Sequence, residues 1–355
     1  MLRRVLTTNL QMSSESTQSN GWFGNWLRWC PTSAAMLEYA ENKILRNVKA
    51  KCERRLVVIG NDECLLTLKV VQKSKDKNKT PLLMLHGFGG GVGLWAQNID
   101  YLSQNRTLYA IDLLGFGRSS RPKFDNDPTL VEKRFIESIE SWRSQVGIDK
   151  FILLGHSLGG FLSASYAISY PQHVKHLILV DPWGFPEKPA ESEYQRRIPR
   201  WIKFVSMLMD PYNPLALVRL SGPWGPQLVK RFRPDFQRKF SNIFGGEDDT
   251  VLDYIYHCNA QEPSGESAFK SMTAAFGWSK DPMIKRVDQI RDDVPITMMY
   301  GARSWIDYET GYVVQKIRSK SFVDVALIPG AGHHVYADRP DLFNEAVFQC
   351  CNSAD

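Results

Sequence analysis

Short apolar runs recur along this chain and alternate with longer segments in which apolar residues repeat at helical spacing. Short runs bounded by Gly, Pro or polar residues predict buried strands, and apolar residues three to four positions apart predict helices that bury one face. This alternation predicts an α/β fold with a mostly parallel central sheet, covered on both faces by helices, and with reactive loops at the carboxyl ends of the strands. We expect strands at residues 81–85, 107–113, 151–154, 177–180, 295–300 and 323–329, and helices at 129–146 and 339–350.

The pattern near the N-terminus is different. Residues 54–60 and 63–72 are rich in β-forming side chains and are joined by Asn61 and Asp62, which predicts a β-hairpin. Before the hairpin, residues 36–51 place their apolar side chains on one side of an amphipathic helix that leads into the domain. We therefore expect a flexible tail with this lead-in helix at residues 1–50, followed by one domain at residues 51–355.

The alternation of strands and helices breaks at about residue 186. Residues 187–292 contain apolar helical stretches and several prolines but no run of the strand type, so we expect a helical cap inserted into the domain. Residues 187–240 contain eleven Lys and Arg against five Asp and Glu, a net charge of +6. Basic residues beside aromatic ones are typical either of a solvated helix face or of a surface that binds a phospholipid headgroup and its acyl chains. The residues are Arg196, Arg197, Arg200, Lys230, Arg231, Arg233, Arg238 and Lys239, with Trp201, Phe204, Phe232 and Phe236.

Residues 151–160 carry the most specific chemical signal, because a buried strand, the pattern G-x-S-x-G and the start of an amphipathic helix follow one another. Gly155 and Gly159 are what such a turn needs, since a Cβ at either position would collide with the neighbouring strand or helix. The turn exposes the Oγ of Ser157, and the following helix directs unpaired N–H groups toward an oxyanion formed there. Ser157 is therefore the candidate nucleophile, and the alternative is a tight structural turn.

A glycine-rich loop at residues 86–91 follows the strand at 81–85. Glycines let backbone N–H groups face a small anion. The loop is either a flexible turn or one arm of an oxyanion hole, with the N–H groups of Phe88 and Leu158 as donors.

Asp307 and His333 stand in loops after successive strands, and with Ser157 they give the chain order Ser, Asp, His that this architecture uses. We expect His333 to be the base and Asp307 the acid of a catalytic triad. Asp181, at the end of the strand at 177–180, is the competing acid.

Composition narrows the classes of function. The 355 residues are 43% hydrophobic and 23% charged, which fits one large domain with an insertion or two ordinary domains. No run approaches the ~18 apolar residues that a membrane-spanning helix requires. The six cysteines are scattered without metal-ligand spacing and fit reduced thiols in an intracellular protein. The net charge of +6 suits anionic lipid surfaces or phosphorylated substrates, and no nucleic-acid-binding motif accompanies it.

The first thirty residues suggest a membrane anchor. Residues 1–20 contain two arginines and several Ser and Thr but no sustained apolar block, so we expect a disordered tail rather than a secretory signal, and mitochondrial association stays open. Trp22, Trp26 and Trp29 fall at i, i+4 and i+7, so one short helical face would carry three indoles. Indoles prefer the membrane–water boundary, which predicts a cytoplasmic protein held peripherally on lipid droplets or membranes. The alternative is an aromatic cluster that packs on the domain.

The chain resembles the α/β-hydrolase superfamily over roughly residues 55 to 350. Four segments are similar to the subfamily of abhydrolase domain-containing proteins four and five: GHSLGGFLSASYAISYP at 155–171, DLLGFGRSSRP at 112–122, YGARSWID at 300–307 and GAGHHVYAD at 330–338. The Trp-rich stretch before the domain also resembles theirs.

That resemblance implies lipid chemistry. Members are described as lysophospholipases or N-acyl phosphatidylethanolamine lipases, as lysophosphatidic acid acyltransferases, and as lipid-droplet coactivators of a triacylglycerol lipase. The vertebrate coactivator branch has Asn at the position of Ser157, so this Ser favours an active hydrolase without excluding coactivation. The family's H-x4-D pattern for acyltransfer is matched by His333 and Asp338. Asp338, just before Arg339 and Pro340, is also well placed as a helix N-cap.

The mechanism that these residues predict is acyl transfer to Ser157. His333 removes the Ser157 proton, Asp307 holds the imidazole and stabilises its cation, and Ser157 attacks an ester or amide carbonyl. Water as acceptor gives a hydrolase, for which the resemblance implies glycerolipid, lysophospholipid or N-acyl phospholipid substrates, and a lysophospholipid hydroxyl as acceptor gives an acyltransferase. The competing function is a binding protein that docks on lipid droplets and activates a separate lipase. No metal or organic cofactor is expected, since the triad and oxyanion hole supply the chemistry.

Overall fold

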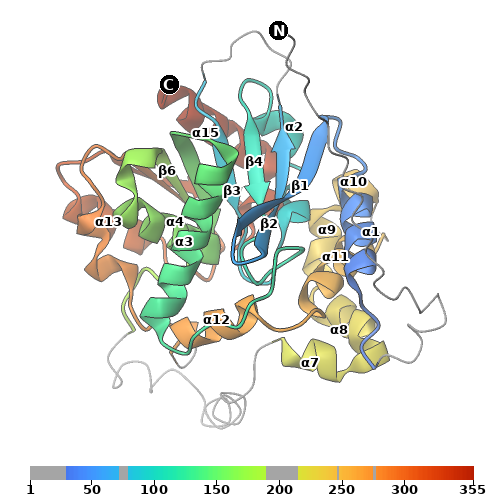
Figure 1. Cartoon of the computed structure of the whole chain (residues 1–355). Helices are drawn as coiled ribbons and strands as arrows, with labels where there is room; N and C mark the ends of the chain where they lie inside the picture. Colours follow the sequence, from blue (N-terminus) through green and yellow to red (C-terminus); the bar gives the residue numbers. More distant parts are fainter. Residues whose placement is uncertain (1–28, 72–78, 189–214, 246–247, 275–276) are drawn as a thin grey trace, which may run out of the picture.

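An eight-stranded sheet is the centre of the molecule (Figure 1). The computed structural model describes residues 29–71, 79–188, 215–245, 248–274 and 277–355. The strand order is β1-β2-β4-β3-β5-β6-β7-β8. The strands are β1 (Cys52–Gly60), β2 (Glu63–Val70), β3 (Leu82–Leu85), β4 (Leu108–Ile111), β5 (Phe151–His156), β6 (Val174–Val180), β7 (Ile296–Gly301) and β8 (Val323–Ile328).

The sheet is mostly parallel, as the sequence predicted. The hairpin of β1 and β2 is antiparallel, β2 pairs with β4 in the antiparallel sense, and the pairings from β4 through β8 are parallel. Asn61 and Asp62 turn the hairpin with positive φ angles of 50° and 58°, which Asn and Asp tolerate better than most residues. The parallel strands therefore end along one edge, where their loops can meet.

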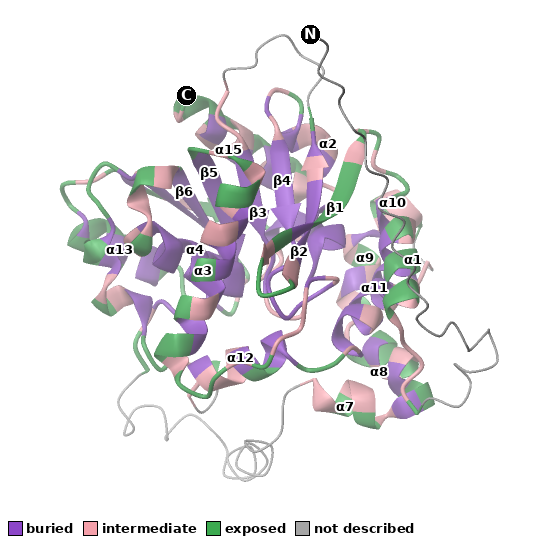
Figure 2. Cartoon of the chain, viewed as in Figure 1, coloured by how far each residue is buried: buried purple, intermediate pink, exposed green. Residues whose placement is uncertain are grey.

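Helices cover both faces of the sheet. One face packs against α3 (Pro128–Val146), α4 (Leu158–Ser169) and α13 (Glu309–Ile317). The other packs against α1 (Ala34–Leu45), α2 (Ile99–Leu102) and α15 (Pro340–Ser353). Because successive strand residues point to opposite faces, Leu82 and Met84 belong to one core cluster and Leu83 and Leu85 to the other. Figure 2 shows these central strands buried.

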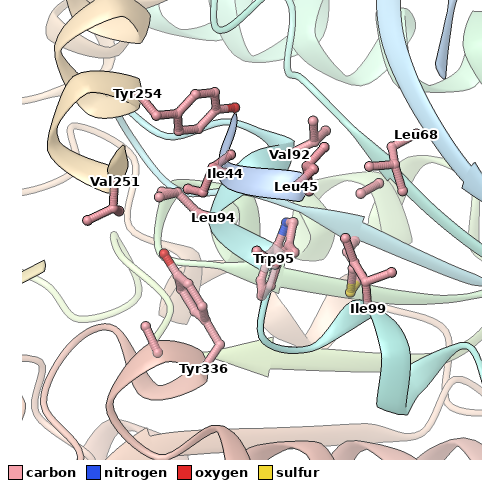
Figure 3. Packing of buried hydrophobic residues seen from close by; sticks show 14 of the residues in the cluster. Ile44, Leu45, Leu68, Val92, Leu94, Trp95, Ile99, Val251, Tyr254 and Tyr336 are labelled. Atoms are coloured by element: carbon pink, nitrogen blue, oxygen red, sulfur yellow. The ribbon is translucent and has the colours of Figure 1, made fainter. Parts of the chain in front are cut away.

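The α1 side of the core is rich in large side chains (Figure 3). Trp95 is almost fully buried, and its ring centroid lies 4.5 Å from that of Tyr336, which follows β8. Ile44 of α1 and Tyr254 of α11 (Thr250–Asn259) pack in the same cluster. Apolar burial of this kind contributes about 25 cal/mol per Å². It joins the lead-in helix, the sheet and the following insertion into one core.

The lead-in helix is shorter than predicted. Ser33 caps the N-terminus of α1 by accepting a hydrogen bond from the N–H of Met36, and the helix ends at Leu45 rather than at residue 51. Beyond Leu45 the chain turns, because the N–H of Val48 donates to the carbonyl of Leu45 at 3.1 Å, and the carboxylate of Asp100 then accepts hydrogen bonds from the N–H groups of Lys49 and Ala50 at 3.0 and 2.8 Å. These backbone groups are satisfied outside a helix.

The insertion between β6 and β7 is helical in its described residues. It contains α7 (Ala216–Leu220), α8 (Gly225–Phe232), α9 (Pro234–Lys239), α10 (Ser241–Phe244), α11 and α12 (Gly265–Met272), with one isolated bridge between Thr273 and Ser279. We call these helices the cap. Figure 1 shows α7 to α11 beside α1, on the right of the view. Residues 189–214, which carry several of the predicted basic and aromatic cap positions, lie outside the described residues.

The two ends of the insertion run side by side. The N–H of Met283 donates to the carbonyl of Gly184 at 2.9 Å, and the N–H of Ile284 donates to the carbonyl of Phe185 at 3.0 Å. The indole N–H of Trp183 donates to the carbonyl of Gly277 at 2.6 Å. The chain therefore leaves and re-enters the sheet region through a hydrogen-bonded pair of segments.

Candidate active site

Ser157 lies in the sharp turn between β5 and α4, with φ 53° and ψ −116°. A non-glycine residue rarely adopts such a backbone, and the surrounding packing holds it. A Cβ on Gly155 would lie 2.2 Å from the carbonyl oxygen of Gly159, and a Cβ on Gly159 would lie 2.5 Å from that of Leu85. Only glycine fits at either position, so the helix starts close against the sheet and presents Ser157 at the strand edge.

A chain of hydrogen bonds connects Ser157 to a buried carboxylate. The Nε2 of His333 lies 3.1 Å from Ser157 Oγ, and its Nδ1 lies 2.8 Å from Asp181 Oδ2. His333 stands in the loop after β8, and Asp181 follows β6 directly. This arrangement has the geometry of a nucleophile, a base and an orienting acid.

The structure corrects the predicted acid, because the carboxylate bonded to His333 is Asp181 and not Asp307. Asp307 is exposed, and its Oδ1 accepts a hydrogen bond at 3.0 Å from the N–H of Glu309 at the start of α13. The loop after β7 serves the site differently. The N–H of Gly301 donates to Asp181 Oδ1 at 3.1 Å, and the hydroxyl of Ser304 donates to Asp181 Oδ2. This loop therefore holds the acid rather than supplying it.

Asp181 is fully buried and has a left-handed backbone with φ 46°. Burial raises its pKa to about 7, while the hydrogen bonds from Ser304 and Gly301 act in the opposite direction. These donors favour the carboxylate form that can orient a histidine.

Burial lowers the pKa of His333 to about 4, and the positive charges of Lys239 and Arg233 act in the same direction. The imidazole is therefore neutral at neutral pH and able to accept a proton. A second histidine, His156, lies inside the G-x-S-x-G pattern and is also buried. Its Nε2–H donates to the carbonyl of His333 at 2.9 Å, and the two ring centroids are 4.8 Å apart. His156 thus fixes the loop that carries the base.

The loop at residues 86–91 lies against the nucleophile. A Cβ on Gly87 would come within 3.0 Å of the Ser157 Cβ, so the backbone approaches the serine closely. The Nε2 of His86 accepts a hydrogen bond from the N–H of Leu113 at 3.0 Å, and its Nδ1–H donates to the carbonyl of Gly87 at 2.8 Å. Leu158 is the first residue of α4, so its N–H has no acceptor within the helix. The N–H groups of Phe88 and Leu158 stay the predicted oxyanion donors.

An apolar cavity of about 380 Å³ lies beside these groups. Phe88 of the glycine-rich loop and His334, which follows His333, form part of its wall. The cap supplies most of the remaining wall, including Leu217, Phe232, Phe236 and Ile255. We call this cavity the apolar pocket. Its position between the oxyanion loop and the histidine loop suits an acyl chain whose carbonyl reaches Ser157.

His333 and Asp338, the two residues of the H-x4-D pattern, bond to different partners and not to each other. Asp338 Oδ2 accepts a hydrogen bond from the N–H of Gly332 at 2.9 Å, and its Oδ1 lies 3.4 Å from Lys239 Nζ. The His333 ring is bonded to Asp181 and Ser157 instead. Asp338 is also not the predicted N-cap, because it ends α14 (Val335–Asp338) and the cap position of α15 is Arg339.

The tryptophans of the predicted anchor are only partly described. Trp22 and Trp26 lie outside the described residues. The indole N–H of Trp29 donates to the carbonyl of Leu220 in the cap at 3.0 Å. Its ring packs edge-on against that of Trp224, with the two ring centroids 6.5 Å apart. Both indoles are nevertheless about two-thirds exposed. Trp29 therefore packs on the domain and still presents an aromatic surface.

We also searched the structure for disulfides, metal-ligand groups and membrane-spanning helices. All six cysteines are free thiols. In the described ranges, we find no group of three His, Cys, Asp or Glu residues that could hold a metal ion. No helix in the same ranges combines the length and apolar character needed to cross a membrane.

Residues 80–340 match the sequence family described as the α/β hydrolase fold. The chain is an α/β-hydrolase. The hydrolase is 55% identical to the (lyso)-N-acylphosphatidylethanolamine lipase of Mus musculus over 339 residues, which cover 95% of this chain and 98% of the relative. It is 52% identical to the Homo sapiens protein named 1-acylglycerol-3-phosphate O-acyltransferase ABHD5 over 344 residues, 97% of each chain. These relatives confirm the resemblance to the subfamily of abhydrolase proteins four and five.

Solved structures agree on the fold of this hydrolase. A bacterial membrane phospholipase A matches with a TM-score of 0.61 at 18% identity and covers 90% of this chain and 92% of its own. The naproxen esterase of Bacillus subtilis matches with a TM-score of 0.60 at 18% identity, covering 89% and 96% of the two chains. At this identity the likeness concerns the fold alone.

Sequence reasoning missed two residues that shape the site of this hydrolase. His156 occupies the variable position of G-x-S-x-G, so the pattern assigns it no role, although a buried histidine beside a nucleophile needs a hydrogen-bond partner. Ser304 lies within the YGARSWID segment, but the sequence assigns it no role, because its contact with Asp181 spans 123 residues. The signal that could have found Asp181 was its position directly after a buried strand, which made it the competing acid.

Proposed function

We propose that this hydrolase cleaves acyl esters or amides of glycerolipids, lysophospholipids or N-acyl phospholipids through an acyl-enzyme on Ser157. The observation that carries the proposal is the hydrogen-bonded series Ser157, His333 and Asp181 beside an apolar pocket. The 55% identity to a protein named (lyso)-N-acylphosphatidylethanolamine lipase supports the substrate class.

Each residue has one role in this mechanism. His333 accepts the proton of Ser157 Oγ as the oxygen attacks the carbonyl carbon, and Asp181 stabilises the imidazolium that forms. The N–H groups of Phe88 and Leu158 bind the negative oxygen of the tetrahedral intermediate. His333 then gives its proton to the leaving alcohol or amine. Water, deprotonated by the same histidine, releases the acid and restores Ser157.

The test is fatty-acid release from lyso-N-acylphosphatidylethanolamine and from a lysophospholipid by the purified full chain. We expect release by the wild type and none by Ser157→Ala. The matched control is Ser169→Ala, on the same helix, because among the described residues the Ser169 hydroxyl bonds to the carbonyl of Ser165 alone. Release that is undiminished in Ser157→Ala contradicts the proposal.

Acyl transfer is a second function of the same site. It is favoured by the 52% identity to a protein named 1-acylglycerol-3-phosphate O-acyltransferase. The acyl-enzyme would then pass its acyl group to the hydroxyl of 1-acylglycerol 3-phosphate instead of to water. Competition between the two acceptors, measured as labelled diacyl product against free acid, decides which one the site uses.

We also propose that the protein works on a lipid surface such as a membrane or droplet. The cap exposes several large apolar side chains, of which Leu217 and Phe232 also line the apolar pocket, and Trp29 contacts two of the others, Leu220 and Trp224. Exposed aromatic clusters of this kind suit the headgroup level of a bilayer or monolayer.

Coactivation of a separate triacylglycerol lipase is the remaining candidate, and it needs no acyl-enzyme. A lipase assay with Ser157→Ala separates the two functions. Full coactivation by this variant would support a docking role beside the hydrolase, and its loss would make the acyl-enzyme part of the effect.

A further inference from the structure

A second, polar pocket of about 660 Å³ lies beside the histidine loop. It is formed by a different face of α9 from the one that lines the apolar pocket, because Phe236 points to the apolar pocket whereas Asp235, Arg238 and Lys239 line the polar one. The opposite wall contains Arg303 from the loop after β7 and Arg339 after β8. We call this cavity the basic pocket.

Most charges in the basic pocket are already paired. Lys239 Nζ lies 3.1 Å from Asp235 and 3.4 Å from Asp338. Arg339 forms a two-pronged ion pair with Asp341 at 3.1 and 2.9 Å.

Two guanidinium groups are not paired with a carboxylate within the described residues. Arg238 makes no side-chain ion pair there, and the guanidinium of Arg303 donates there only to the carbonyl of Gly330. Both side chains are exposed to solvent in the pocket. Two unneutralised positive charges therefore face the same space.

We propose that the basic pocket binds a phosphate monoester group, with Arg238 and Arg303 as its main ligands. The guanidinium fork matches two phosphate oxygens at once, and a phosphate monoester carries about −1.5 to −2 charges at neutral pH. Its charge thus balances the two unpaired arginines. The pocket lies within the volume range of small-molecule sites, and its size leaves room for the glycerol unit that bears the phosphate.

The basic pocket adjoins the reaction site through backbone and side-chain contacts. Gly332 lines it and directly precedes His333. The N–H of Arg303 donates to the carbonyl of Ala331 at 2.8 Å, so the loop after β7 is joined to the histidine loop. Lys239 Nζ lies 3.4 Å from Nδ1 of His334, and His334 lines the apolar pocket. The wall between the two pockets is thus α9 with the histidine loop.

An amphiphile can therefore place its acyl chain in one pocket and its phosphate in the other, with the ester near Ser157. This placement rests on the proposed function, whereas phosphate binding does not. The ligand chemistry is shared by a lipid headgroup and by a soluble phosphate monoester.

The experiment measures binding by titration calorimetry to the full chain carrying Ser157→Ala, which removes turnover. The probes are inorganic phosphate, glycerol 3-phosphate, 1-lauroylglycerol and 1-lauroylglycerol 3-phosphate. We expect the acylated phosphate to bind at least ten times more tightly than 1-lauroylglycerol. Adding Arg238→Gln and Arg303→Gln should remove that difference.

The matched control is Arg55→Gln with Arg231→Gln, which removes the same charge from two exposed arginines that do not line the pocket. It should keep the tenfold preference. Arg238→Gln alone, whose side chain makes no ion pair to lose, should reduce the preference without disturbing the fold. If inorganic phosphate also binds and loses affinity with the arginine changes, the pocket takes soluble phosphates; if only the acylated probe binds, the source is a lipid headgroup.

An unchanged preference in the Arg238 and Arg303 variant, or no gain from the phosphate in the parent, overturns the proposal. The separate readout for the proposed function is hydrolysis of a soluble short-chain ester. It is measured with the same arginine variants in a chain that keeps Ser157. Phosphate binding can fail while that ester is still cleaved. Equally, the ester can remain uncleaved while phosphate still binds.

Discussion

Asp181 Oδ2 lies 2.8 Å from His333 Nδ1 although the two residues are 152 positions apart in the chain. The contact forms because β6 and β7 are neighbours and β8 lies next to β7, so the loops after these parallel strands open on the same edge. The intervening loop, after β7, donates two hydrogen bonds to Asp181. The acid, its supports and the base therefore come from three successive strand ends.

Ser157→Ala should abolish covalent labelling by a serine-directed fluorophosphonate and lower the turnover of a soluble ester by about 10⁴-fold or more, because no other hydroxyl replaces the nucleophile. Labelling is read on a gel and turnover by product release. Ser169→Ala should retain both. Full labelling of Ser157→Ala would place the nucleophile elsewhere.

Asp181→Asn should lower turnover by about 10⁴-fold, because an amide at that position holds the wrong tautomer of His333. Asp307→Asn should leave turnover within about twofold, since Asp307 is exposed and its carboxylate bonds to the start of α13 rather than to His333. The measurement is kcat on a soluble ester for both variants. A crippled Asp307→Asn beside a nearly active Asp181→Asn would restore the acid expected from the sequence.

The acid limb of the pH profile of kcat/KM should move to higher pH when Lys239 is replaced by Gln. His333 must be neutral to accept the Ser157 proton, and Asp181 must be ionised to stabilise the imidazolium. Burial and the charges of Lys239 and Arg233 lower the pKa of His333 to about 4, whereas burial raises the pKa of Asp181 to about 7, so the limb belongs to the hydrogen-bonded pair. Lys239→Gln removes a positive charge that disfavours the imidazolium, so the pKa of His333 should rise. A limb at the same pH in both proteins would contradict this prediction.

Replacing Trp22, Trp26 and Trp29 by Ala should release the protein from liposomes or lipid droplets in a flotation assay, while the soluble esterase activity stays intact. Burying each indole, about 150 to 250 Å² at ~25 cal/mol per Å², can contribute several kcal/mol to attachment. Ordering the segment offsets part of this gain.

The matched comparison for that assay is Trp224→Ala with Phe232→Ala, which removes two exposed rings from the cap. If this pair, and not the tryptophan triple, abolishes flotation, the cap is the main attachment site. Loss of esterase activity in the triple variant would mean that Trp29, through its bond to Leu220, supports the fold.

Much of the fold could be predicted from the sequence, because buried parallel strands read as continuous apolar runs. The strand ends are accordingly close to the predicted ones, as at Phe151–His156 and Val323–Ile328. The lead-in helix was less predictable, since the residues that follow it bond to Asp100, which lies about fifty residues away in the chain.

The candidate site was partly predictable for a similar reason. Ser157 and His333 lie in local sequence patterns that are typical of a nucleophile turn and of a histidine loop. The acid has no such pattern, because Asp181 and Asp307 each follow a predicted strand. Choosing Asp181 over Asp307 requires knowing which carboxylate is buried and which faces water. Burial of a single side chain depends on contacts across the whole chain, which no local pattern contains.

The paired ends of the cap have a consequence for how such a protein can change over time. Gly184 and Phe185 are hydrogen-bonded to Met283 and Ile284, so the entry and exit of the insertion meet at one point. Asp181 precedes this junction and Gly301 follows it, which leaves the acid and its supports on the sheet side. Changes of substrate can therefore arise inside the insertion, which supplies most of the wall of the apolar pocket, while Asp181 keeps its supports. Because α11 of the cap also packs in the core cluster with α1, such changes must leave that packing in place and act on side chains that face the pocket.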